Sequence, residues 1–120
     1  LKETYFSAIE NIDNPKLKLE SIFLSHVKFA RTHPTHYEMI FNHKFREYEI
    51  EVIENKQKAC SIIAEVISEF GTIDSEITYI HYFSLLEGFV KISPELPNQS
   101  DEFVNSVIKT ISENFVLGLG

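Results

Sequence analysis

Apolar residues recur at intervals of three and four along almost the whole chain, which is the spacing of a helix with one buried face. After a first helical segment at the N-terminus, this spacing predicts helices over about residues 15–31, 34–42, 44–70, 75–92 and 100–116. No strand interpretation competes, because the segments are long and their period is helical. The sequence therefore predicts an all-α fold of about six helices.

Residues that cap or break helices mark the predicted ends. Asn14 is suited to cap a helix whose first residue is Pro15. Pro34 ends the preceding helix, because the residue before a proline disfavours the helical backbone conformation. Gly71 is a good C-terminal stop, and Ser100 is predicted to cap the last helix. The breaks therefore agree with the apolar pattern on where the helices start and stop.

The helix predicted over 75–92 is apolar around most of its circumference. At about 100° per residue, its polar positions fall within roughly 80° of one another, and these are Glu76, Ser84, Glu87 and Lys91. A helix this apolar has to be covered on two sides, and the last helix has a similar excess of apolar residues. Either both helices are central in a monomer, or a second copy of the chain covers them.

We favour a symmetric homodimer that is formed through a four-helix bundle. Gly88 stands in the middle of its helix at a cost of about 1 kcal/mol relative to alanine, and close approach of another helix would explain it. A charge at Phe89 or Ile108 is expected to weaken this association. The residues predicted to form the interface are Tyr82, Phe89, Val104, Ile108, Ile111 and Phe115.

Composition and charge exclude several classes of protein. The 120 residues suffice for one domain with a real core. The net charge of -7 disfavours direct DNA binding, because phosphate contacts need clustered lysine and arginine. The single cysteine, Cys60, excludes an internal disulfide framework and a cysteine-rich zinc site. With no apolar run of about 18 residues, we expect a cytoplasmic protein that does not span a membrane.

Motifs for metal binding and catalysis are missing from the sequence. The five histidines form neither an HExxH pattern nor the Glu-x-x-His pairs of di-iron bundles. There is no phosphate loop, no G-x-S-x-G and no GxGxxG. The carboxylates over residues 47–54 are typical of a solvated helix face. We therefore expect no metal, no cofactor and no enzymatic activity.

His26 and His81 each lie among apolar residues of a predicted helix. Each is either a core histidine with one hydrogen-bond partner or a polar group that orients a ligand in an apolar cavity. Such a cavity is expected between the helices at 15–31, 44–70 and 75–92, with an apolar or aromatic drug-sized ligand. An acidic ligand would be favoured if either histidine is protonated. The expected lining residues are Phe23, His26, Tyr37, Phe41, Tyr48, Val52, His81 and Leu85.

Three stretches of the chain carry a family resemblance. The first contains Phe29-Ala30, His33-Pro34, Tyr37 and the apolar residues 39–41. The second is the segment 81–90 with Gly88, and the third is the ending Phe-Val-Leu-Gly-Leu at 115–119. In this order and spacing the chain resembles the C-terminal domain of TetR-type bacterial transcriptional regulators.

The resemblance implies an organisation and a mechanism. Residues 1–12 would be the tail of the helix that links this domain to an N-terminal helix-turn-helix domain, which the 120 residues lack. Residues 13–120 would be the ligand-sensing and dimerisation domain of a repressor. A small effector in the cavity would shift the linking helix, so that the DNA-reading heads of the dimer no longer match successive major grooves. Operator DNA would be bound only through the missing domain.

Two other classes of function remain open at this point. The chain can be a stand-alone helical module that binds another protein and has a filled core without a ligand. It can also be a helical-bundle metalloprotein or enzyme.

Overall fold

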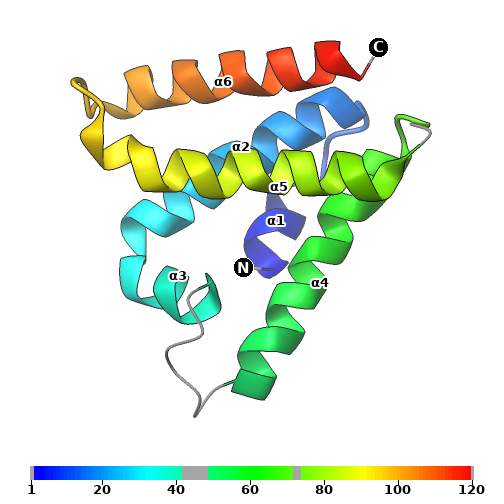
Figure 1. The fold of residues 1–120 in the computed structure, drawn as a ribbon, viewed down its shortest axis with the longest axis horizontal. Coiled ribbons are helices and arrows are strands. Elements are labelled where there is room, and N and C mark those ends of the chain that lie inside the picture. Colours follow the sequence, from blue (N-terminus) through cyan, green and yellow to red (C-terminus); the bar gives the residue numbers. More distant parts are fainter. Residues whose placement is uncertain (1, 42–48, 72–73, 120) are drawn as a thin grey trace.

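The computed structural model describes residues 2–41, 49–71 and 74–119. Within these residues the chain forms six α-helices, one short 3-10 helix and no strand, which confirms the predicted all-α class (Figure 1). The elements are α1 (Lys2–Ile9), α2 (Pro15–Thr32), α3 (Pro34–Phe41), α4 (Glu49–Ser68), α5 (Ser75–Ile92), η2 (Ser93–Glu95) and α6 (Asp101–Gly118).

The helix ends follow from the capping residues. The Asn14 side chain accepts a hydrogen bond from the backbone N–H of Lys16 at 2.9 Å, directly before Pro15 opens α2. The Ser100 hydroxyl accepts from the N–H of Phe103 at 3.2 Å and caps α6. Gly71 follows α4 with a φ of 64°, a left-handed conformation that glycine adopts without strain. The predicted start of α4 at residue 44 lies outside the described residues.

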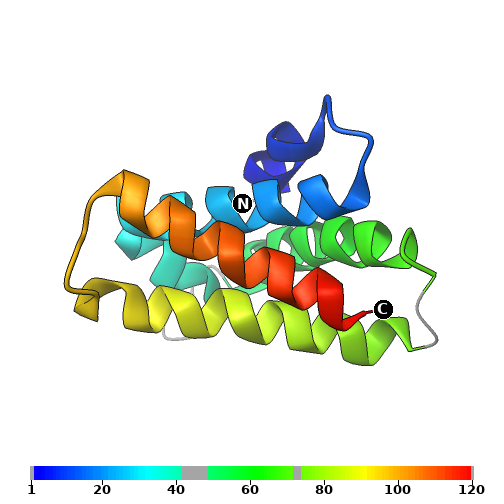
Figure 2. The same cartoon turned by 90° about the horizontal axis from the view of Figure 1, so that it is seen from above.

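The central element is α2, which contacts each of the other five α-helices. In the view from above, α1 lies on one side of α2 and α5 on the other (Figure 2). The apolar stripe of α2 is fully buried from Leu19 through Phe23 to Val27, and His26 is buried with it. The sequence pattern pointed to 75–92 as the most enclosed helix, whereas the structure encloses α2 and leaves one face of α5 in solvent.

Most apolar side chains of α5 and α6 that were predicted to face a second copy pack on their own chain. Phe23 meets Tyr82 and Phe89 edge to face, with ring centroids 6.2 and 5.8 Å apart. Of the residues predicted to form the dimer interface, five lie in this core and Ile111 is half-buried against it; the five are Tyr82, Phe89, Val104, Ile108 and Phe115. The interface prediction was therefore wrong for these five, because packing among α2, α5 and α6 buries them within one chain. A dimer would have to use other residues.

One face of α5 is exposed along the length of the helix. We call this the exposed face of α5 and define it by Ile77, Ile80, Ser84, Gly88 and Ile92, all of them exposed. These positions lie within about 120° of one another around the helix. No other part of the described chain comes within 4 Å of the place where a Cβ on Gly88 would lie. Close packing within the chain therefore does not explain this glycine.

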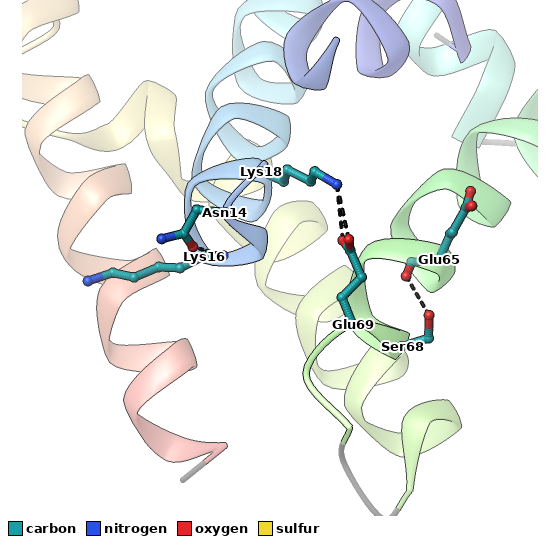
Figure 3. A network of polar contacts seen from close by, with 6 residues as sticks. All are labelled: Asn14, Lys16, Lys18, Glu65, Ser68 and Glu69. Carbon is teal, nitrogen blue, oxygen red and sulfur yellow. Dashed lines mark hydrogen bonds and ion pairs between the residues drawn. The ribbon is translucent and has the colours of Figure 1, made fainter. Parts of the chain in front are cut away.

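A surface ion pair joins the start of α2 to the end of α4 (Figure 3). The Lys18 ammonium lies 3.2 Å from both carboxylate oxygens of Glu69. Because both side chains are partly in solvent, the pair contributes about 1 kcal/mol at most. Packing of the apolar faces therefore holds α2 and α4 together.

Candidate functional site

A chain of hydrogen bonds runs through the interior and joins four helices. The hydroxyl of Tyr5 in α1 lies 2.5 Å from Nδ1 of His26 in α2. The other ring nitrogen, Nε2, lies 3.1 Å from the hydroxyl of Tyr37 in α3 and 3.4 Å from the carboxylate of Glu87 in α5. Tyr37 in turn donates its hydroxyl proton to the same Glu87 oxygen. Tyr5 and His26 are fully buried, so their polar atoms depend on these bonds.

The direction of each bond follows from the protons that the chain has to place. Tyr37 donates its single hydroxyl proton to Glu87, so its oxygen accepts the N–H of His26. Tyr5 has no other partner among the described residues, so it donates to the unprotonated Nδ1. This bonding pattern places a proton on Nε2 of His26.

The ionisation of the other members follows from their burial and their partners. Burial raises the pKa of Tyr5, and burial together with the bond to Glu87 raises the pKa of Tyr37, so both phenols stay neutral. Burial by itself would raise the pKa of Glu87. The interactions with His26, with Tyr37 and with Lys56, in that order of size, outweigh burial and lower the pKa of Glu87 below its usual 4.5. Glu87 is therefore a carboxylate at neutral pH.

Aromatic rings enclose the middle of this chain. The His26 ring meets Tyr37, Phe41 and Phe83 edge to face, with centroids 5.4, 5.6 and 6.4 Å away. Tyr37 and Phe41 lie against each other at 4.5 Å. The Lys56 ammonium lies 5.1 Å from the centre of the Phe41 ring, within the range of a cation–π contact. The rings keep water from His26, which strengthens the electrostatic interactions around it.

A cavity of about 640 Å³ opens next to Tyr37 and Glu87, between α2, α3, α5 and the segment 93–99. Its lining combines apolar residues of these helices with a few polar side chains, an arrangement typical of small-molecule sites. The segment is fastened to α2 because Arg31 donates to the backbone oxygen of Gln99 at 3.0 Å. The Gln99 side chain donates to the backbone oxygens of Ser93 and Leu96 at 2.8 Å.

The structure brings three of the predicted site residues together. Tyr37 and Phe41 line the cavity, and His26 lies directly behind them in the hydrogen-bond chain. Tyr48 and the side chain of Val52 fall outside the described residues. Among the described parts of the chain, the cavity is bounded by α3 where the sequence pointed to the helix at 44–70.

The other predicted residues lie elsewhere. Phe23 fills the core, and Leu85 is half-buried against that core. His81 is exposed, and its ring rests on Phe115 of α6 with centroids 5.1 Å apart. The expectation that His81 faces a common cavity with His26 was wrong, because His81 lies about 120° around α5 from Glu87. Helical spacing shows that His81 has apolar neighbours within its own helix, but it does not show which other helices pack against it.

Sequence reasoning missed Tyr5 and Glu87. Glu87 was assigned to the solvated arc of its helix, although it follows Phe83 by one helical turn and so shares that residue's side of α5. Tyr5 shows nothing in the sequence beyond its place in the first helical segment. Its partner His26 is 21 residues away, and no pattern within either helix indicates the pairing.

Other kinds of site find little support in the part of the chain that the structure describes. No group of three histidine, cysteine, aspartate or glutamate side chains is arranged there to hold a metal ion. None of the helices described combines the length and the apolar character that a bilayer crossing requires. Comparison with protein-family models, curated proteins and solved structures finds no match to this chain.

Proposed function

We propose that the chain is the effector-sensing and dimerisation domain of a TetR-type transcriptional regulator, in which a small molecule binds the cavity between α2, α3 and α5. The family resemblance of residues 29–41, 81–90 and 115–119 motivates the proposal. The observation that carries it is the hydrogen-bond chain from Glu87, at the cavity wall, to Tyr5 in α1. In this proposal α1 is the end of the helix that leads to a DNA-binding domain.

The chain of hydrogen bonds provides a physical link between the cavity and α1. A ligand that bonds to Tyr37 competes with the bonds that orient the His26 ring, and a ligand that bonds to Glu87 weakens the carboxylate as their acceptor. Because Tyr5 is fully buried, any loss of its bond to Nδ1 leaves the hydroxyl without a partner. That costs about 1–3 kcal/mol, the same scale as a typical allosteric coupling free energy. Ligand binding would therefore shift the position or the stability of α1.

Amide hydrogen exchange tests this link. The probe is naphthylethanol, an uncharged aromatic molecule of suitable size, at a saturating concentration. We expect it to change the exchange rates of α1 amides in the native chain and to leave them unchanged in Tyr5→Phe, although it binds both proteins. The amides of α6, which no member of the chain contacts by a hydrogen bond, serve as the internal reference. Binding without any change in α1 of the native chain would overturn the sensing role.

The proposed homodimer uses the exposed face of α5, and its partner is a second copy of the chain. Ile77, Ile80 and Ile92 are 54–64% exposed and share this one face of α5, and several large apolar side chains on one exposed face are typical of an interaction surface. Gly88 on the same face leaves room for a second helix to approach.

Sedimentation velocity at micromolar concentrations checks the oligomeric state. The native chain should be a dimer, and Ile80→Lys should weaken association by about tenfold or more, because the lysine would be buried without a partner. Leu17→Lys alters an exposed apolar side chain of α2 and is the matched control, with native association expected. A monomer at every concentration would contradict this part of the proposal.

A further inference from the structure

Charge is unevenly distributed in the cavity next to Tyr37. Four charged side chains line it, of which Arg31, Glu38 and Lys91 are exposed and lie in water. The Glu87 side chain is only 27% exposed and is therefore the deepest charge. Charges in water are screened, whereas a partly buried carboxylate acts strongly on a ligand beside it. The deepest part of the cavity is therefore negative.

The Glu87 carboxylate has an oxygen to spare. Among the described residues, Tyr37 donates to Oε1, and Nε2 of His26 lies 3.4 Å from the same oxygen. Its second oxygen, Oε2, receives no hydrogen bond from any residue that the structure describes. Lys56 is near enough to lower the pKa of Glu87, but the two form no ion pair among the described contacts. A carboxylate accepts bonds at both oxygens, so a ligand that donates protons has a partner here.

The surroundings of Glu87 suit a cation with an apolar body. Tyr37 and Phe41 line the cavity beside Glu87, and aromatic rings of this kind attract cations, as the Lys56 ammonium over the Phe41 ring shows. The remaining wall near them contains Val27, Ala30 and Val90, which suit a hydrocarbon or aromatic group. The volume of about 640 Å³ lies within the usual range of sites for drug-sized molecules.

We infer that the ligand of this cavity is an organic cation, an ammonium group on an aromatic or apolar body, with the ammonium bonded to Oε2 of Glu87 and packed on the rings of Tyr37 and Phe41. The inference rests on the proposed function, whose cavity it uses. A ligand with a carboxylate would place its charge beside Glu87 and would be repelled.

The test compares three probes that differ only in their polar group: naphthylethylamine, naphthylethanol and naphthylpropionate. Titration calorimetry on the full chain at neutral pH measures each dissociation constant. We expect the amine to bind most tightly and the carboxylate most weakly. Glu87→Gln should weaken the amine by on the order of 10- to 100-fold and the alcohol by much less, because a neutral hydroxyl gains less than an ammonium from the charge of the carboxylate. Retained binding of the alcohol shows that the variant still forms the cavity.

Glu38→Gln is the matched control, because Glu38 lines the same cavity but is exposed. It should change the affinity for the amine by about threefold at most. Equal or tighter binding of the carboxylate, or a preference for the amine that survives Glu87→Gln, would overturn the inference. The sensing role would be unaffected by that result, since hydrogen exchange with the uncharged probe tests it independently. If none of the three probes binds at millimolar concentration, the cavity is not their site and both proposals fail.

Discussion

His26 is a fully buried side chain whose two ring nitrogens both need a partner. Tyr5 and Tyr37 supply these partners from two other helices, and Glu87 completes the chain from a third. Each of these residues is a hydrogen-bond partner of the next. Removing one therefore leaves a buried polar group without a partner, at a cost of about 1–3 kcal/mol. The four residues should therefore behave as a unit in stability as well as in binding.

A double-mutant cycle measures this coupling. Tyr5→Phe should lower the free energy of unfolding by about 1–3 kcal/mol, because Nδ1 of His26 loses its donor. Combined with His26→Leu, the two effects should fall short of their sum by at least about 1 kcal/mol. Tyr82→Phe is the control, since the Tyr82 hydroxyl bonds to the backbone oxygen of Leu19 and not to His26. Urea unfolding gives all the values, and equal coupling in both cycles would argue against a specific chain.

Acid should weaken the folded state through Glu87. Its pKa in the folded chain lies below the ordinary 4.5, so its stabilisation is complete above that pH and is lost as pH falls through the folded pKa. Between pH 6 and pH 3 the native chain should lose more stability than Glu87→Gln, which has no carboxylate to protonate. Glu38→Gln should follow the native chain. Parallel pH curves for the native chain and Glu87→Gln in urea unfolding would refute this assignment.

At the scale of elements, polar caps hold the helix ends that position the site. Ser100 starts α6 directly after Gln99, whose backbone oxygen fastens the segment 93–99 to Arg31. The cap of α6 therefore also determines where one wall of the cavity begins. Because α6 packs along α2, a frayed first turn would loosen both elements.

Removal of this cap should have a measurable cost. Ser100→Ala should lower the free energy of unfolding by about 1 kcal/mol, because the N–H of Phe103 loses its acceptor. Ser106→Ala, six residues later, removes only an exposed hydroxyl that bonds within the helix. It should change stability by less than about 0.5 kcal/mol. Thermal or urea unfolding compares the two variants. A loss for Ser106→Ala as large as that for Ser100→Ala would show that the cap is not the cause.

At the scale of the whole molecule, α2 is enclosed while α5 keeps an open face. Among the described residues, no atom outside α5 lies within 4 Å of a Cβ built on Gly88, so packing between these residues does not require a glycine there. In the proposed dimer the absence of a Cβ would let a helix of the second copy approach closely. A substitution at Gly88 is therefore expected to affect the monomer and the dimer differently.

Gly88→Ala should act in opposite directions on folding and association. In the monomer, at nanomolar concentration, alanine should stabilise the chain by about 1 kcal/mol through its higher helix propensity. At micromolar concentration the new methyl group should weaken the dimer, as measured by sedimentation. Ser84→Ala, on the same exposed face, only removes a hydroxyl and adds no bulk. It should leave association near the native value. Unchanged association of Gly88→Ala would show that no helix packs against this position.

Helix class, helix ends and the main apolar stripes could be derived from the sequence alone, because spacing and capping act within a few residues of each other. Asn14, Gly71 and Ser100 took the roles expected of them for that reason. Which helix is central, and which apolar residues face the core, was decided by packing between helices. The bonds of His26 to Tyr5 and Glu87 likewise span 21 and 61 positions of the chain, and they form only once α1 and α5 pack on α2.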